Sequence, residues 1–470
     1  MTLNEILAVR PSPGQPRAYR FPSFERTVLP NGLQILAVHV PGRPLVSANL
    51  VVRRGVADEP ADLAGATILA ARAMSEGTER YPGVELTEAA ERLGATLHVE
   101  ASWDAFVGSV EVAATRLRAA LELLAEQLEN PTFPEEDVAR IRDERLNDLL
   151  QGRADPRRRV ERAFSRTIYS AESPYARPAG GSEESVPGLT TDNLRSVHRS
   201  LLAPSQAALL IGGDLSGLDV ATLAADTLGV LGEATGRTEA PRAESALTGP
   251  IVRFHHHPGA VQTEIRIGHV GLSRQIPDFH AVQVMSAILG GLFNSRLQMN
   301  LREEKGYTYG VGASFDMRRG AGPFSVRTAV QTAVTVPAIV ESLSELRRIR
   351  ETLVAPAELA AARDYLVGVF PLRFETPGAV VGSLGGLFIQ DLPDDELAMY
   401  RSRVEAVTIE DVREAAQHID LERLAIVAVG DADAVGADLE AAGFGETQIV
   451  REELPGFGDE PGADEGGAAR

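Results

Sequence analysis

The sequence contains no cysteine among its 470 residues. That absence excludes disulfides, thiolate catalysis and cysteine-based zinc or iron–sulfur sites. Long apolar runs are also missing. None approaches the ~18 consecutive apolar residues of a membrane span, and residues 1–22 hold no apolar block long enough for a signal peptide. Basic residues are the minority, 46 against 66 acidic ones, which gives a net charge of −20. We therefore expect a cytoplasmic protein with no nucleic-acid or membrane partner, because both partners demand a basic footprint.

The length of the chain predicts two domains, because single cores stop growing near ~250–300 residues. Residues 232–249 have few large apolar side chains and are predicted to link the two domains. The remaining segments are predicted as an N-terminal arm over 1–22, a first domain over 23–231, a second domain over 250–452 and a disordered tail over 453–470.

Three features recur along the chain at nearly one offset, with separations of 218, 217 and 215 residues. A helix expected after Thr190 matches one expected after Thr408. An apolar strand ending in Gly-Asp follows each helix, and the segment 46–50 matches the segment 261–265. This pattern indicates a duplicated domain.

Local patterns predict the strands and helices of the first domain. The turn Pro30-Asn31-Gly32 between apolar runs predicts a hairpin over residues 27–38. The further strands are expected at 46–52, 97–101 and 105–112, and the helices at 64–74, 86–93, 114–128 and 134–151. This mixed order predicts an α+β fold with two homologous domains, each a mainly antiparallel sheet with helices packed on one face.

The stretch over residues 288–311 is the most informative for function. A helix is expected to stop at Gly290-Gly291, and paired glycines predict a mobile loop that another backbone can approach. Arg302 offers a planar fork of donors for a carbonyl or carboxylate, and Tyr309 offers a phenol for a developing oxyanion. The alternative interpretation is that Arg302 pairs with a neighbouring acid such as Glu303 and that Tyr309 is a strand residue packed on the sheet.

The strings LGGLFNSRL and LREEKGYTYGV in this stretch resemble the C-terminal-domain signature of the insulinase/pitrilysin family of inverzincin peptidases. The similarity is to the bacterial small-subunit, processing-peptidase-like branch and covers nearly the whole chain. It implies two homologous α+β domains that form half of a clamshell. It also implies that Arg302 and Tyr309 act on substrate, that Tyr307 is the fallback for the tyrosine, and that Gly290 and Gly291 form part of a peptide gate.

Active members of this family carry an inverted zinc motif, His-x-x-Glu-His, on the first helix of the N-terminal domain. The resemblance places this motif on Ile68, Ala71 and Arg72, and the distal glutamate near Asp148. Isoleucine and alanine cannot bind zinc, and arginine is a fixed cation. No histidine lies between His39 and His98 that could substitute for these positions. The chain is therefore expected to hold no metal.

The resemblance implies the subunit of a two-chain peptidase that lacks the zinc motif. Its partner is expected to be a homologous subunit with an intact His-x-x-Glu-His motif that holds the zinc, and its substrate an unfolded peptide. We expect the chain to be inactive alone. The alternative is a catalytically inactive, peptidase-like scaffold or peptide-binding subunit.

A run of three histidines opens the second domain. On a strand, His255 and His257 would share a face and could bind a metal, but such runs at strand ends are more often solvated.

Overall fold

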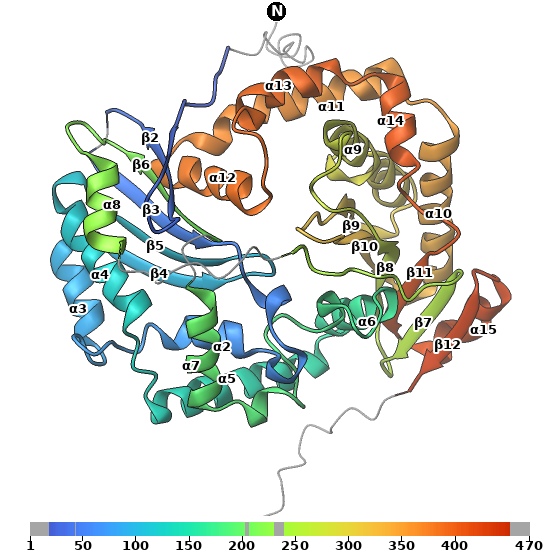
Figure 1. Cartoon of the computed structure of the whole chain (residues 1–470). Coiled ribbons are helices and arrows are strands. Elements are labelled where there is room, and N and C mark those ends of the chain that lie inside the picture. Colours follow the sequence, from blue (N-terminus) through green and yellow to red (C-terminus); the bar gives the residue numbers. More distant parts are fainter. Residues whose placement is uncertain (1–17, 43, 203–205, 230–238, 452–470) are drawn as a thin grey trace, which may run out of the picture.

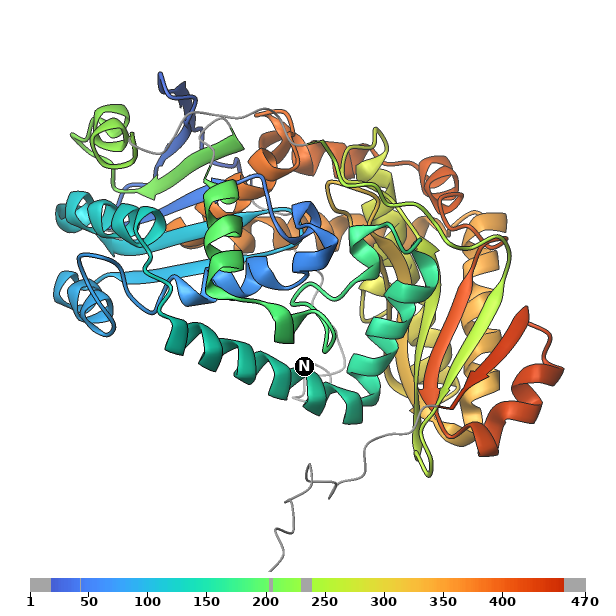
Figure 2. The same cartoon turned by 60° about the horizontal axis from the view of Figure 1, so that its bottom comes forward.

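The computed structural model describes residues 18–42, 44–202, 206–229 and 239–451. It places two sheets side by side, the first built from blue to green segments and the second from yellow-green to red ones (Figure 1; Figure 2). Most of the predicted arm, part of the predicted linker and the predicted tail over 453–470 lie outside the described residues. The domain boundaries proposed from the sequence stay predictions.

The first sheet has six strands in the order β1-β2-β6-β3-β5-β4. The pair β2–β6 is parallel and the other neighbours are antiparallel. The hairpin around Asn31-Gly32 is confirmed, with Thr27 opposite Ile35. The strands are β1 (Glu25–Val28), β2 (Gln34–His39), β3 (Leu45–Val52), β4 (Thr96–Ala101), β5 (Phe106–Ala113) and β6 (Ala207–Gly213).

The second sheet repeats this plan with the order β12-β7-β11-β8-β10-β9. Its pairs β12–β7 and β7–β11 are parallel, and its other three pairs are antiparallel. The strands are β7 (Ile251–His256), β8 (Gln262–Val270), β9 (Thr308–Phe315), β10 (Pro323–Gln331), β11 (Ala425–Gly430) and β12 (Glu446–Val450). Both sheets are mainly antiparallel, as the sequence predicts.

The duplication is visible in matching local structure. Thr190 and Thr408 each cap a helix, accepting a hydrogen bond from the backbone N–H of Asn193 (3.3 Å) and of Asp411 (3.1 Å). In both cases the side chain of the third helical residue accepts a hydrogen bond from the backbone N–H of the capping threonine, which completes a capping box. Each capped helix leads to a fully buried strand, β6 or β11.

Most helices of each half, though not all, form a main core with their own sheet. Those of the first half are α2 (Ala66–Ala73), α3 (Glu85–Leu93), α4 (Leu117–Glu129), α5 (Glu135–Ala154), α6 (Pro156–Ile168), α7 (Thr191–Leu201) and α8 (Val220–Leu228). Those of the second half are α9 (Phe279–Ser286), α10 (Thr335–Glu351), α11 (Pro356–Val369), α12 (Pro377–Ile389), α13 (Glu396–Ala406), α14 (Ile409–Ala416) and α15 (Ala432–Ala441). Among the helices described, none combines the length and the apolar character needed to cross a bilayer.

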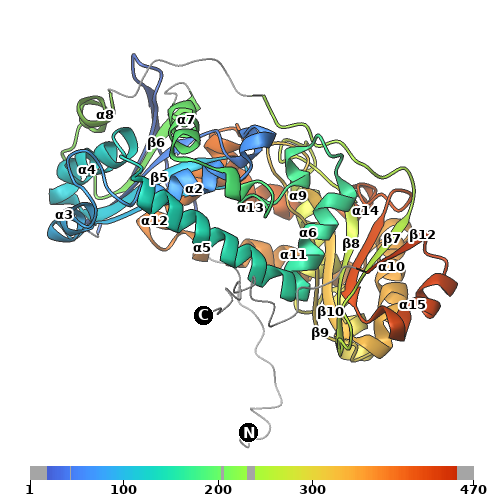
Figure 3. The ribbon, with the colours of Figure 1, turned by 90° about the horizontal axis from the view of Figure 1, so that it is seen from below.

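Two helices are exchanged between the halves, and this exchange was not predicted. Helix α6 of the first half packs on β8 and β11 of the second sheet, beside which it lies in Figure 3. Helix α12 of the second half packs on β3 and β6 of the first sheet. Phe164 of α6 joins a cluster with Val427, and Leu384 of α12 joins one with Leu210. Through this exchange, apolar side chains of the two halves are buried against each other, which holds the halves together.

The expectation of helices on one face of each sheet is therefore incomplete. The second face of each sheet is covered by a helix of the other half, at least over the central strands. The strands explain why, because every residue of β6 and of β11 is buried. A continuous apolar run, unlike an alternating one, is typical of a strand covered on both faces.

Glu129 at the end of α4 gives the first half a pH-dependent stability. Burial, with a smaller contribution from Glu126, raises the pKa of Glu129 to about 7. The folded state therefore holds this proton more tightly than the unfolded chain, and stability falls as the pH rises from about 4.5 to about 7. We expect Glu129→Gln to raise the free energy of unfolding at pH 8 by about 1–2 kcal/mol, allowing for partial solvent screening, and to change little at pH 4.5.

Urea unfolding at the two pH values measures this effect. Glu122→Gln, on the exposed side of the same helix, is the matched control and should leave the difference between the two pH values as in the parent. An equal effect of Glu129→Gln at both pH values would contradict the proposed titration.

Candidate functional site

The positions of the expected zinc motif lie on helix α2, which packs against α5 and α7. Ile68 is half-buried and Ala71 is buried, so neither offers a ligand atom. Arg72 is exposed, and its guanidinium forms an ion pair with Glu144 of α5. The ion pair joins α2 to α5 at the place where the motif would put its second histidine.

Glu144, which the sequence analysis did not single out, is the carboxylate of α5 that faces α2. Asp148, the expected distal position, lies one helical turn further along and does not contact Arg72. Glu144 also accepts a hydrogen bond from Arg140 (3.0 Å), which holds the pKa of this glutamate below its ordinary value. Glu144 precedes Asp148 by four residues and so shares its helix face, and this spacing is the sequence signal that could have indicated Glu144.

Asp148 binds two arginines. Arg158 binds it with both terminal nitrogens, at 2.9 Å and 2.8 Å, and Arg145 contacts it at 2.5 Å. The hydrogen bonds from Arg158 lower the pKa of Asp148 from its usual value. Such a bidentate pair uses both carboxylate oxygens. The residues present therefore do not fit zinc: two of the motif positions have no ligand atom, the third is a cation, and the nearby carboxylates bind guanidinium groups.

The structure brings Arg302 and Tyr309 together. Arg302 lies in the π-helical segment Gln298–Glu304, and Tyr309 lies on β9, one of the two edge strands of the second sheet. Gly306, in the left-handed region at φ +65°, makes the turn between these two elements. The guanidinium carbon of Arg302 lies 5.5 Å from the centre of the Tyr309 ring. Two side chains seven residues apart in sequence thus form one contact.

Both side chains remain accessible. Tyr309 is 93% exposed, so the interpretation in which it packs on the sheet is wrong for this residue. Arg302 does form an ion pair with Glu303, as the alternative interpretation expects, with Nε 3.4 Å from a carboxylate oxygen. Within the described residues, no hydrogen bond to an acid engages the two terminal nitrogens of Arg302. These nitrogens lie in one plane and can both donate to a carbonyl oxygen.

Gly290 and Gly291 do not form the open loop that was expected. They end the π-helical segment Ala287–Gly291, which continues α9. Gly290 is buried, and a Cβ atom there would lie 2.4 Å from the backbone nitrogen of Ala313 on β9, so this glycine permits close packing of helix and strand. Gly291 is exposed. Tyr307 is half-buried against the second core, in contrast to Tyr309.

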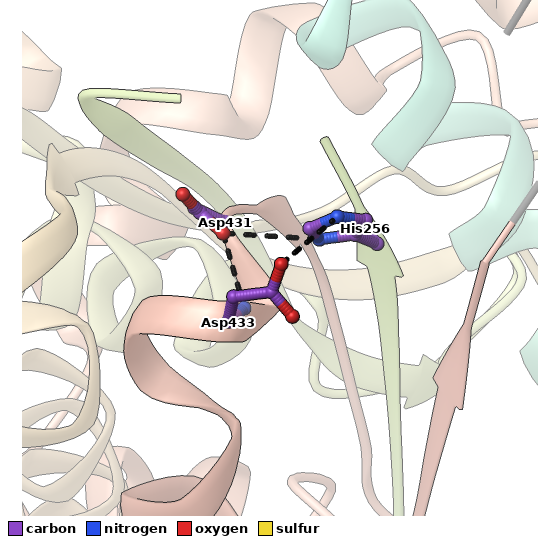
Figure 4. A group of neighbouring side chains, drawn as sticks. All are labelled: His256, Asp431 and Asp433. Carbon is purple, nitrogen blue, oxygen red and sulfur yellow. Dashed lines mark hydrogen bonds and ion pairs between the residues drawn. The ribbon is translucent and has the colours of Figure 1, made fainter. Parts of the chain in front are cut away.

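One group of three side chains in the described part of the chain is close enough to hold a metal, and it involves His256 with Asp431 and Asp433 (Figure 4). The expected pair His255 and His257 is not part of this group. Nδ1 of His256 accepts a hydrogen bond from the N–H of Ala432 (3.1 Å), which leaves the proton on Nε2, 3.7 Å from Asp433.

The two aspartates of this group are also engaged. Asp431 caps helix α15 by accepting from the N–H of Asp433 (3.0 Å), and its other oxygen accepts from the N–H of Gly259 (3.1 Å). Asp433 pairs with Arg451 (2.6 Å). These bonds join α15 to β7 and explain the group as a structural cap.

The fold and the site define a two-domain, peptidase-like chain in which Ile68, Ala71 and Arg72 stand at the positions of the zinc motif. Two family models match it: "Insulinase (Peptidase family M16)" over residues 34–179 and "Peptidase M16 inactive domain" over residues 188–366, together more than half of the chain. The chain belongs to this insulinase family, M16.

Relatives support the same assignment. An uncharacterized zinc protease of Mycobacterium bovis is 24% identical over 90% of this chain and 96% of its own length. A non-peptidase homologue of Helicobacter pylori is 22% identical over 79% of this chain and 85% of its own length. The chain is therefore similar both to relatives named as proteases and to one named as lacking that activity.

Solved structures show the same architecture. The crystal structure of a peptidase M16 inactive domain from Pseudomonas fluorescens matches with a TM-score of 0.81 and 25% identity, covering 87% of this chain and 98% of the other. A protease from Helicobacter pylori matches with a TM-score of 0.80 at 17% identity, covering 88% and 100%. The two-domain α+β fold is thus confirmed.

Proposed function

We propose that this chain is the non-zinc subunit of a heterodimeric zinc metallopeptidase. The observation that carries the proposal is the exposed contact between Arg302 and Tyr309, made by a chain whose own zinc-motif positions cannot bind metal. A phenol that is 93% exposed buries almost no apolar surface and so adds little to the stability of the folded chain. The accessible pair is explained by contact with another molecule.

In this proposal the substrate is an unfolded peptide, and the partner is a homologous subunit with an intact His-x-x-Glu-His motif that holds the zinc. Arg302 orients the peptide carbonyl through its two terminal nitrogens. The hydroxyl of Tyr309 donates a hydrogen bond to the oxygen that becomes negatively charged during attack. Gly291, exposed at the end of the helical segment, lies on the same stretch of chain and contributes backbone to the peptide path.

A second candidate function is an inactive scaffold or peptide-binding subunit. The Helicobacter relative is named a non-peptidase homologue and the Pseudomonas structure an inactive domain, and both names favour this function. The ion pairs at Arg72 and Asp148 also fit it, because they tie α2, α5 and α6 together where a catalytic site would need free ligands.

A quenched-peptide cleavage assay separates the two functions, with zinc content measured on the same samples. We expect no cleavage by this chain alone, and cleavage with one zinc per pair when it is mixed with the motif-bearing homologue of the same genome. Cleavage by this chain alone would overturn the proposal. A stable complex that fails to cleave would establish the scaffold function instead.

A further inference from the structure

Arg302 contacts a second exposed ring besides Tyr309. Its guanidinium carbon lies 4.8 Å from the centre of the Phe293 ring, closer than the 5.5 Å to Tyr309. Phe293 is 67% exposed and follows the π-helical end of α9. We propose that Phe293 is a positioning residue that fixes the guanidinium group of Arg302 for its role on the substrate. This inference rests on the proposed function.

The argument starts from the freedom of an arginine side chain. A long, partly exposed arginine has many rotamers, and fixing one of them on substrate binding costs entropy. Within the described residues, the ion pair that restrains Arg302 is the single contact with Glu303 at 3.4 Å. The two aromatic rings lie within the ~6 Å range of cation–π attraction. They are the contacts that select one orientation of the guanidinium.

A ring restrains an arginine without using its hydrogen-bond donors. The attraction acts between the charge of the guanidinium and the electrons of the ring, and the ring offers no oxygen or nitrogen acceptor that would occupy the N–H donors. An acidic partner would instead accept those N–H groups and compete with a substrate carbonyl. Phe293 is hence suited to orient Arg302 and leave its terminal nitrogens available, whereas an acid bound to those nitrogens would occupy them.

The backbone that carries Phe293 is held on both sides. Before it, the N–H of Leu292 donates to the carbonyl of Ala287 (3.2 Å), and the N–H of Ser295 donates to the carbonyl of Leu292 (3.1 Å). After it, the buried Arg296 binds Glu358 of α11 with two hydrogen bonds, at 2.7 Å and 3.0 Å. The ring therefore stands on a fixed turn, which a positioning role requires.

A double-mutant cycle in the assembled pair tests the proposal. We expect Phe293→Leu to lower kcat/KM about 3–10-fold, the size of a partly desolvated cation–π contact, and Phe293→Tyr to restore it because the ring remains. In an Arg302→Ala background, Phe293→Leu should have no further effect. An equal loss in that background, or no loss in the parent, would overturn the proposal. Tyr365→Leu, which removes a 53% exposed ring on α11, is the control and should leave kcat/KM unchanged.

A second measurement, on this chain alone, tests the contact between Phe293 and Arg302 independently of the proposed function. In an arginine-labelled sample, Phe293→Leu should shift the Nε–H resonance of Arg302 by removing the ring current, whereas Tyr365→Leu should not. An unchanged resonance overturns the proposal whatever the pair does. A shifted resonance together with an inactive parent pair keeps the positioning contact and overturns the proposed function.

Discussion

Tyr309→Phe in the assembled pair is expected to lower kcat/KM by about 10²–10³-fold, the loss measured when one oxyanion donor is removed. The substitution deletes only the phenolic hydroxyl. Because Tyr309 is 93% exposed, we expect removal of this hydroxyl to leave the core and the stability of the chain unchanged. A change in activity thus reports the chemistry of the hydroxyl and not a folding defect.

Arg302→Ala is expected to act on the same step through the substrate carbonyl, so the double variant should lose less than the product of the two single losses. Steady-state kinetics of the purified pair, with complex formation checked by size-exclusion chromatography, provide the measurement. Tyr365→Phe, at an exposed tyrosine on α11, is the control for loss of a surface hydroxyl. Full activity in a pair that carries both substitutions would show that this chain takes no part in catalysis.

The duplicated fold could be predicted because its signals are local. The threonines that cap α7 and α14 must precede a helix, since their side chains satisfy backbone N–H groups that are free only at a helix start. The Asn31-Gly32 turn likewise fixes its hairpin by backbone conformation alone. Such features need no knowledge of distant parts of the chain, and two copies at one offset are sufficient to reveal the repeat.

The exchange of α6 and α12 between the halves could not be predicted in the same way. An amphipathic pattern shows that a helix buries one face, but it does not show which sheet receives that face. The all-buried runs of β6 and β11 indicate a second covering layer without naming it. Long-range packing decides on which sheet each helix lies, as Phe164 of α6 shows by packing with Val427 of the second sheet.

The candidate site was predicted only in part, for a similar reason. Arg302 and Tyr309 were recognised from the motif, and the structure brings them into contact. Glu144 was missed because its partner Arg72 lies 72 residues away in the sequence. Phe293 lies in the same stretch as Arg302, but the sequence does not show that its ring faces the guanidinium. Gly290 was expected to give mobility, but in the structure it serves close packing against β9. A glycine in a sequence does not distinguish these two uses.

The double substitution Ile68→His/Arg72→His is expected to create a zinc site in this chain, raising its zinc content to about one ion. Positions 68 and 72 lie one turn apart on α2, so two histidines there would share a helix face, the spacing that binds zinc in helical motifs. Removing Arg72 also releases the Glu144 carboxylate, which contacts that position from α5, from one of the two arginines that bind it. Two imidazoles and one carboxylate form a sufficient set of protein ligands.

Two measurements follow from this arrangement, and neither depends on catalysis. After dialysis against zinc, elemental analysis should find the metal in the double variant. Added zinc should also raise its melting temperature, because a ligand that binds only the folded state stabilises it by ~2.7 kcal/mol at 100 times Kd. Adding Glu144→Gln should weaken both effects if this carboxylate is the third ligand. If the double variant folds but binds no zinc, the missing ligands alone do not explain why the parent lacks a zinc site. The spacing of the α2 and α5 backbones would then exclude the metal as well.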